Sequence, residues 1–197
     1  MNYYALLSVS NKDGIVDFGE GLVRAGYTLI SSGGTHAVLQ AEGIPVMKVS
    51  EYTGSPEILN GRVKTLHPKI HGGILAQRGN PVHDIDRKAN EIGLIDIVAV
   101  NLYPFKETVA KPDVTLAEAI ENIDIGGPSM VRSAAKNYKD VAVLTNPNQY
   151  GIYLDSIKGN ISIQPDTLRK QFMLEAFKHT AEYDATISEW MSQNAGD

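Results

Sequence analysis

The sequence has no cysteine among its 197 residues. It can therefore form no disulfide bond, no thiolate zinc site and no cysteine nucleophile, which is compatible with a reducing cytosol. Long apolar runs are missing as well, because no segment approaches the roughly 18 residues that a membrane-spanning helix needs. Residues 1–4 also lack the charged-then-apolar pattern of a secretory signal. These absences predict a cytoplasmic protein.

An excess of positive charge is lacking too, since the formal net charge is -5. Nucleic acids and anionic membranes normally select a basic face, so neither partner is predicted. An anionic ligand would have to be bound by a local cluster of cations. The length suits one domain, predicted over residues 1–197, and a hydrophobic content of 43% suits an ordinary globular core.

Short apolar segments rich in β-branched residues alternate with segments of helical periodicity. The segments predicted as strands are 3–9, 27–30, 45–49, 95–102 and 141–144. Helices are predicted between them, two of which would end before Gly26 and Gly43. A further helix is predicted from about 128 to 136, with Pro128 at its first position. This order predicts an α/β fold with three layers, α/β/α, around a mostly parallel sheet of about five strands. Residues 165–191 form a predicted C-terminal helical extension.

Polar segments follow three of these strands, at residues 8–12, 31–35 and 101–105. In a parallel sheet such segments meet at one edge, where ligands bind. The Ser-Ser-Gly-Gly-Thr segment at 31–35 precedes a helix and could bind a phosphate through its amides, hydroxyls and the helix dipole. A turn needed only for backbone geometry explains that segment equally well. The positive charges of Lys12, Arg62 and Lys64 favour phosphate binding over that explanation. Neither Gly-x-Gly-x-x-Gly nor a P-loop is present, which disfavours dinucleotide enzymes and NTPases.

Residues 61–71 gather Arg62, Lys64, Lys69 and two histidines in an otherwise acidic protein. Flanking glycines and Pro68 predict a shaped loop that binds an anion, although a solvated surface turn would have the same composition. His67 and His71 are four residues apart, as in some metal sites. Because Pro68 would interrupt a helix there and no acidic third ligand has a matching spacing, we expect these histidines to be loop scaffolding and predict no metal.

A carboxylate directly precedes two glycines in the segment Asp124-Ile125-Gly126-Gly127. This arrangement suits acid–base chemistry beside an oxyanion site made of backbone amides. An aspartate near the start of a helix is also a common stabilising feature, and the segment alone favours that simpler explanation.

Taken together and in this order, the motifs resemble those of the inosinate (IMP) cyclohydrolase domain, the N-terminal part of a bifunctional purine-biosynthesis protein. The matching segments are 8–12, 32–35, 61–68, 101–105, 124–127 and Ala134-Ala135-Lys136-Asn137. The resemblance covers essentially the whole chain and implies a methylglyoxal-synthase-like fold. It also implies a homodimer, and a formyltransferase domain that would follow in a full-length protein, so that no formyltransferase activity is expected from this chain.

The implied reaction closes the purine ring of 5-formamidoimidazole-4-carboxamide ribotide (FAICAR) to give IMP and water, without a metal or redox cofactor. Asp124 would be the base or proton shuttle, with Lys136 beside it. Lys64, Tyr103 and the amides of Gly126 and Gly127 would stabilise the oxyanion. The substrate-binding residues implied for the 5′-phosphate are Ser10, Lys12, Ser32, Gly33, Gly34 and Thr35, and those implied for the rest of the substrate are Arg62, Thr65, Leu66, Asn101, Ile125, Gly126 and Gly127.

Two other functions fit part of these motifs. Methylglyoxal synthase would share the phosphate loop and a carboxylate base, and a non-catalytic nucleotide-sensing module would share the phosphate loop alone. The segments around Arg62 and Tyr103, and the region after residue 165, favour the cyclohydrolase.

Overall fold

The computed structural model describes residues 3–161, 163 and 165–194, so the ends of the predicted domain, 1–2 and 195–197, lie outside the described residues. Five strands form one sheet in which every neighbouring pair is parallel, in the order β3-β2-β1-β4-β5. The strands are β1 (Tyr3–Leu7), β2 (Tyr27–Ser31), β3 (Val46–Lys48), β4 (Ile95–Ala99) and β5 (Ala142–Leu144). The predicted α/β class and five-stranded parallel sheet are confirmed.

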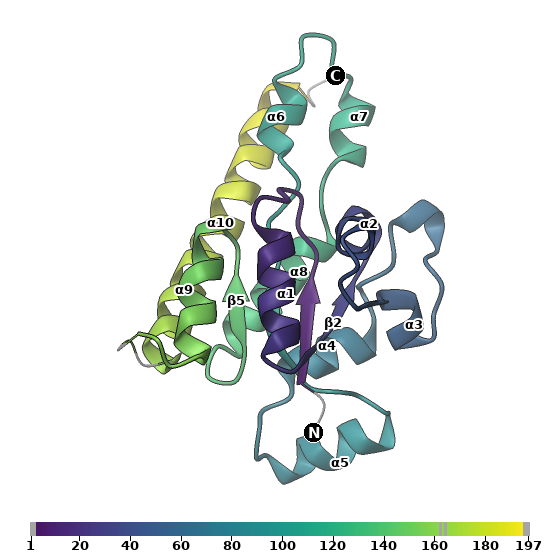
Figure 1. Cartoon of the computed structure of the whole chain (residues 1–197). Coiled ribbons are helices and arrows are strands. Elements are labelled where there is room, and N and C mark those ends of the chain that lie inside the picture. The colour runs from purple at the N-terminus through teal and green to yellow at the C-terminus, as the bar shows by residue number, and fades with distance from the viewer. Residues whose placement is uncertain (1–2, 162, 164, 195–197) are drawn as a thin grey trace.

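Helices cover both faces of this sheet (Figure 1). They are α1 (Ile15–Arg24), α2 (Gly33–Ala41), α3 (Val49–Thr53), the 3-10 helix η1 (Leu59–Gly61), α4 (Pro68–Leu75), α5 (Pro81–Ala89), α6 (Phe105–Val109), α7 (Leu116–Glu121), α8 (Gly126–Lys136), α9 (Asn148–Ile157) and α10 (Pro165–Asn194). In Figure 1, α1 crosses in front of the sheet, and α4 and α8 lie behind it. These layers make the three-layer arrangement.

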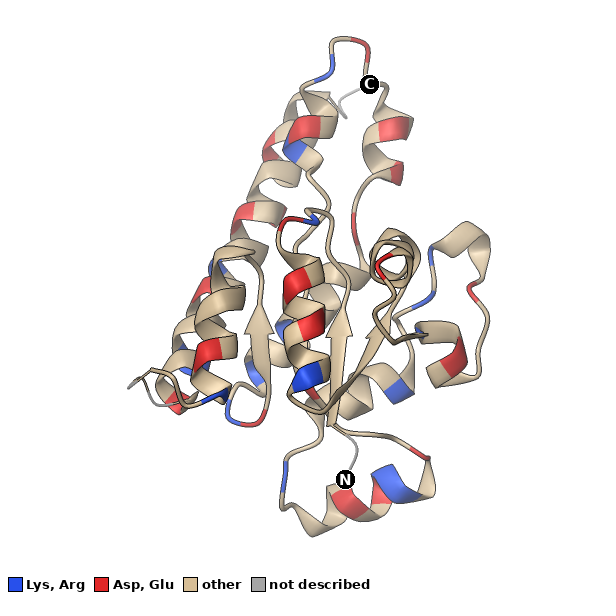
Figure 2. Cartoon of the chain, viewed as in Figure 1, with Lys and Arg blue, Asp and Glu red and all other residues tan. Residues whose placement is uncertain are grey.

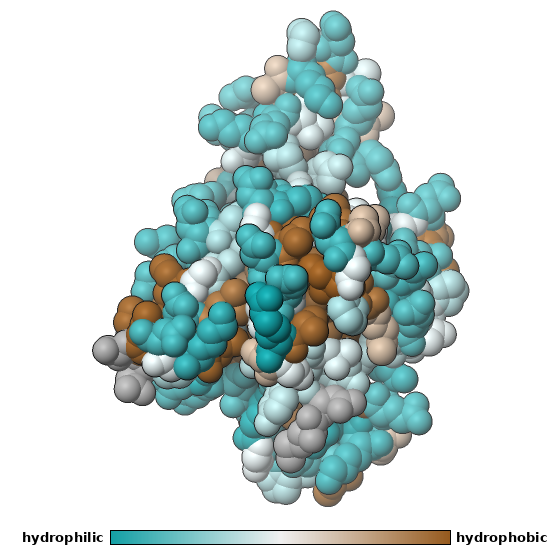
Figure 3. Space-filling view, in the orientation of Figure 1, coloured by the Kyte–Doolittle hydropathy of each residue, from teal (hydrophilic) through white to brown (hydrophobic). Residues whose placement is uncertain are grey.

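The central strands are apolar on both faces, as a parallel sheet between two helical layers requires. Leu6 and Leu7 of β1 and Ile97 and Val98 of β4 are fully buried. The surface is more polar. Figure 3 shows mostly hydrophilic residues on its face of the molecule, with apolar atoms visible between α1 and α2. In the view of Figure 2, acidic and basic residues are interspersed along the ribbon.

Two proline positions differ from the sequence prediction. Pro68 starts α4 at its first residue, with His67 as the N-cap, so residues 68–71 are helical and not part of a loop. Helix α8 starts at Gly126, which makes Pro128 its third residue. Both positions tolerate proline for the same reason, since the first turn of a helix has no preceding carbonyl to accept its N–H groups.

Helix α10 contains the predicted helix of residues 165–191 and runs three residues further. Its first half packs on the core, where Leu168, Phe172 and Ala176 are buried. Its second half runs alongside α6, and these two helices with α7 form the narrow upper part of Figure 1. No helix in the described part of the chain is long and apolar enough to cross a membrane.

Candidate active site

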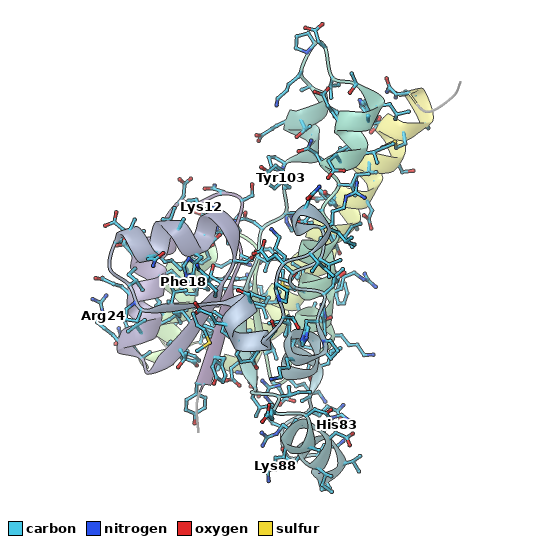
Figure 4. The ribbon with its side chains drawn as sticks, turned by 90° about the vertical axis from the view of Figure 1, so that its right-hand side faces the viewer. Lys12, Phe18, Arg24, His83, Lys88 and Tyr103 are labelled. Carbon is cyan, nitrogen blue, oxygen red and sulfur yellow. The ribbon has the colours of Figure 1, made fainter. Side chains whose placement is uncertain are left out.

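A cavity of about 610 Å³ lies at the carboxyl ends of the strands, within the range of about 300 to 1,000 Å³ usual for small-molecule sites. It is lined by Ser8, Val9, Lys12, Ser32, Gly33, Gly34, Thr35, Asn60, Gly61, Arg62, Lys64, Thr65, Tyr103, Ile120, Glu121, Asn122, Ile123, Asp124, Ile125, Gly126, Gly127 and Met130. Figure 4 shows Lys12 and Tyr103 toward this end of the molecule, whereas His83 and Lys88 of α5 lie at the opposite end.

Two hydroxyl side chains link the carboxyl ends of β1 and β2 by hydrogen bonds. The Thr35 hydroxyl accepts a hydrogen bond from the Val9 amide and donates one to the Val9 carbonyl, both at 3.0 Å. The Ser31 hydroxyl donates to the Leu7 carbonyl at 2.6 Å. Both side chains are buried. The Thr35 side chain therefore holds the wall of the cavity in place, and its backbone amide is the group that it offers to a ligand.

The N-terminus of α2 forms one wall of the cavity. Ser32, the N-cap residue, has an extended backbone and its side chain does not cap the helix. Gly33 has a φ of +54°, a left-handed conformation that favours glycine. The amides of Gly33, Gly34 and Thr35 occupy the first helical turn, where no helical carbonyl can accept them. This wall presents N–H donors and the positive end of the helix dipole.

Lys12 supplies a cation beside that wall. A methyl group placed on Gly34 would lie 3.9 Å from the Lys12 Nζ atom. The same ammonium group donates hydrogen bonds to the carbonyls of Val9 and Ser10. Partial burial lowers the pKa of Lys12 from its ordinary value. The carbonyls of the segment that follows β1 thus hold this cation close to the first turn of α2.

Arg62 and Lys64 reach the cavity from the segment after η1, and each is paired with a carboxylate. Arg62 forms a bidentate pair with Glu121 of α7, which lowers the pKa of that carboxyl. The Lys64 Nζ atom lies 3.6 Å from Glu57. The two carboxylates thus form ion pairs with the cations that an anionic ligand would otherwise bind.

Asp124 is fixed at the start of α8. Its carboxylate accepts a hydrogen bond from the Gly127 amide at 2.8 Å. The Gly127 amide is therefore already engaged, which corrects its predicted role as an oxyanion donor. Both glycines allow close approach, because a methyl group on Gly126 would lie 2.6 Å from the Thr65 hydroxyl and one on Gly127 would lie 2.3 Å from the Asp124 carboxylate.

Lys136 does not lie where the resemblance places it. It is exposed and is the last residue of α8. At about 1.5 Å per residue, the ten residues from Gly126 put it about 15 Å along the helix from the turn that holds Asp124. Within this chain the two side chains are not neighbours.

Three predicted binding residues lie outside the cavity. Ser10 and Asn101 line an adjacent cavity of about 460 Å³. There the Asn101 side chain accepts hydrogen bonds from the amides of Ser10 and Asn11, so it orders the edge of the sheet. Leu66 is not among the lining residues of the larger cavity.

The two histidines bind protein atoms. His67 accepts a hydrogen bond from the Lys69 amide and contacts the Ser55 hydroxyl at 3.2 Å. The Nδ1 atom of His71 lies 3.1 Å from the Ser133 hydroxyl, and burial lowers its pKa. His67 caps α4 and His71 lies within it, so the segment that these histidines support is a helix and not the predicted loop.

Sequence reasoning missed several lining residues, namely Ser8, Val9, Asn60, Gly61, Ile120, Glu121, Asn122, Ile123 and Met130. Ser8, Val9 and Gly61 lie inside motifs that were recognised. No sequence motif identifies residues 120–123 as cavity residues, because it is the path of the chain through α6 and α7 that brings them to the cavity. Glu121 is 59 residues away from its partner Arg62.

The fold and the site agree with known families. The MGS-like domain model matches residues 14–129, and the chain belongs to the MGS-like domain family. The AICARFT/IMPCHase bienzyme model matches residues 134–197.

Individual relatives point the same way. The chain is 61% identical over 190 residues to the bifunctional purine biosynthesis protein PurH of Synechococcus sp. (strain CC9902), covering 96% of this chain and 36% of that protein. It is 58% identical to PurH of Synechococcus sp. (strain CC9605), covering 97% and 37%. Among solved structures, the crystal structure of ForH superimposes with a TM-score of 0.83 at 31% identity, covering 96% of this chain and 98% of that one. These matches confirm the resemblance predicted from the motifs. The chain spans just over a third of the length of the curated relatives.

Proposed function

We propose that this chain is an IMP cyclohydrolase, which closes the purine ring of FAICAR to give IMP and water in purine biosynthesis. The proposal depends on one observation. A single cavity is lined by the N-terminus of α2, which suits a phosphate, by the carboxylate of Asp124 and by the phenol of Tyr103. The likeness to PurH over nearly the whole chain supports it. The domain would extend over residues 1–197.

The 5′-phosphate would bind at the first turn of α2. The amides of Gly33, Gly34 and Thr35 and the hydroxyl of Ser32 would donate to its oxygens, and Lys12 would neutralise part of its charge. The ribose and imidazole would then extend toward Lys64, Thr65 and the start of α8, which line the same cavity.

Ring closure requires a weak amide nucleophile to attack the formyl carbon. Asp124 would accept a proton from the carboxamide nitrogen as the new C–N bond forms. The formyl oxygen becomes the oxyanion of a tetrahedral intermediate, for which Lys64, Tyr103 and the Gly126 amide are the available donors. Protonation of that oxygen and its loss as water, with loss of the proton on the former formamide nitrogen, form the C=N bond that completes the ring, and the former carboxamide nitrogen keeps its second hydrogen. Holding both groups in one cavity supplies the orientation that an intramolecular closure needs.

The remaining assignments come from the composition and the charge of the sequence and from the resemblance. We propose a cytoplasmic homodimer that needs no metal or redox cofactor, binds neither nucleic acid nor membrane, and is followed by a formyltransferase domain in the full-length protein. Its partners would be the ribotide substrate FAICAR and the product IMP.

The test is to incubate the purified chain with FAICAR and follow the purine absorbance. We expect turnover by the wild-type chain and a loss of kcat of about 100-fold or more in Asp124→Asn, which keeps the shape but cannot accept the proton. A folded wild-type chain without turnover would refute the proposal.

A second substrate distinguishes a cyclohydrolase from a methylglyoxal synthase. Dihydroxyacetone phosphate should give no methylglyoxal, and a positive result would favour a methylglyoxal synthase. Binding of IMP by a chain that turns over neither substrate would favour a nucleotide-sensing module.

A further inference from the structure

Helix α10 sends two side chains to the backbone of the candidate active site. The Tyr183 hydroxyl oxygen accepts a hydrogen bond from the Asp124 amide at 2.7 Å. The Nε2 atom of His179 accepts one from the Leu102 amide at 3.3 Å. Leu102 directly precedes Tyr103 in the chain. One turn of α10 therefore contacts the backbone at both candidate reaction groups.

Neither side chain lines the cavity, so any effect on the reaction passes through the backbone. Tyr183 is 8% exposed. Its ring packs edge-on against Phe105 with the ring centroids 6.5 Å apart, and Trp190, further along α10, packs edge-on against the same ring at 6.1 Å. Phe105 begins α6, two residues after Tyr103. These contacts hold the Tyr183 hydroxyl in place.

The two contacted segments both lie next to Gly127. A methyl group placed on Gly127 would lie 2.9 Å from Cδ2 of Leu102 and 2.3 Å from the Asp124 carboxylate. The Gly127 amide in turn donates to that carboxylate. Leu102 and the Asp124 carboxylate therefore both lie close to Gly127, and α10 contacts the backbone of both residues from outside the cavity.

The protonation states suit these hydrogen bonds. His179 must have an unprotonated Nε2 atom to accept from an amide. Burial lowers the pKa of His179, with an opposing contribution from Glu182, so the neutral form is favoured. Burial also raises the pKa of Tyr183, which keeps its phenol neutral.

Helix α10 and the residues that it contacts are matched by two different family models. The MGS-like match ends at residue 129, whereas the match to the AICARFT/IMPCHase bienzyme covers residues 134–197 and contains α10. The two side chains that bind the Leu102 and Asp124 amides therefore come from the region beyond the MGS-like match of residues 14–129.

We propose that His179 and Tyr183 are positioning residues that set the relative placement of Tyr103 and Asp124 for ring closure. The inference rests on the proposed cyclohydrolase function for its kinetic consequences, and on the structure alone for the backbone contacts.

The kinetic test compares Tyr183→Phe and His179→Leu with a control on the same helix. Each removes one acceptor from a backbone amide, and we expect kcat on FAICAR to fall about tenfold with KM within twofold of wild type. His179→Gln can keep an acceptor near the Nε2 position and should restore most of the activity. Thr180→Val, which removes a buried hydroxyl bonded to the Phe177 carbonyl of α10 itself, should leave kcat unchanged.

A second measurement is independent of activity. Hydrogen exchange followed by NMR should show faster exchange of the Asp124 amide in Tyr183→Phe and of the Leu102 amide in His179→Leu, with the amides of β1 and β4 as protected as in wild type. Unchanged exchange at both amides would overturn the inference, as would a loss of kcat in Thr180→Val equal to that in Tyr183→Phe. If the wild-type chain does not turn over FAICAR, the proposed function fails and the exchange data alone decide the inference.

Discussion

Three side chains of the candidate site, those of Asp124, Arg62 and Lys64, are each held by a neighbouring residue to which no part of the proposed reaction is assigned. The Asp124 carboxylate is held by the Gly127 amide, and its backbone by the Tyr183 hydroxyl. Arg62 and Lys64 are held by Glu121 and Glu57. At the scale of single residues, the cavity is therefore organised by hydrogen bonds and ion pairs that already exist without a ligand.

Gly127→Ala tests how closely Asp124 is packed. The added methyl group would lie 2.3 Å from the carboxylate and 2.9 Å from Leu102, so one of these groups must move. We expect kcat to fall at least tenfold. The control is Gly151→Ala in α9, where nothing lies within 4 Å of the added group. This control should retain full activity and gain stability, by about 0.5 to 1 kcal/mol, measured by denaturant unfolding. Wild-type kcat in Gly127→Ala would show that the Asp124 position is not critical.

Glu121→Gln tests whether the carboxylates compete with the substrate. Removing the negative charge beside Arg62 should lower KM for the ribotide about threefold, and less at high salt, because both groups are exposed and screened. Glu20→Gln is a matched control, since Glu20 forms a similarly exposed pair with Arg24 on α1. An equal decrease of KM in both variants would mean that net charge is responsible, and not the Arg62 pair.

At the scale of elements, α2 and α10 have complementary tasks. The N-terminus of α2 offers amides to the cavity, and Lys12 lies beside them. Helix α10 stays outside the cavity and fixes the backbone of the segment after β4 and of Asp124, which precedes the start of α8. The first helix would recognise the substrate, and the second would keep the reaction groups in register.

Lys12→Met tests the role of the α2 N-terminus in phosphate binding. The change keeps most of the side-chain volume and removes the cation, so IMP should bind about tenfold more weakly, measured by isothermal titration calorimetry. Lys88→Met on the exposed surface of α5, at the opposite end of the molecule, should bind IMP like wild type. Equal affinities for the two variants would remove Lys12 from the proposed phosphate site.

At the scale of the whole molecule, two half-buried histidines couple folding to pH. Burial lowers the pKa of both His71 and His179. The unfolded chain therefore binds more protons than the folded one between the lowered values and the ordinary value of about 6.5. This contribution to stability is complete above pH 6.5 and is lost as the pH falls below it.

The free energy of unfolding should consequently decrease between pH 7.5 and pH 5. The double variant His71→Gln/His179→Gln has no such histidines, and its unfolding free energy should change less over the same interval, measured by urea denaturation. An equally steep decrease in the double variant would assign the pH dependence to other groups.

The sequence by itself determined the fold class and the edge of the sheet that carries the site. Alternating β-branched and helix-period segments specify strands and helices through local backbone and burial preferences, so four of the five strands fall within the predicted segments and β2 runs one residue beyond its own. The polar segments after β1, β2 and β4 meet at one edge because parallel strands all point the same way.

Only the tertiary structure decided which of these residues face one cavity. Contacts between distant segments, such as Arg62 with Glu121 or Asp124 with Tyr183, have no local signature. Helix geometry separates Lys136 from Asp124 although the resemblance places them side by side. Local preferences fix elements, whereas packing between elements fixes the distances on which chemistry depends.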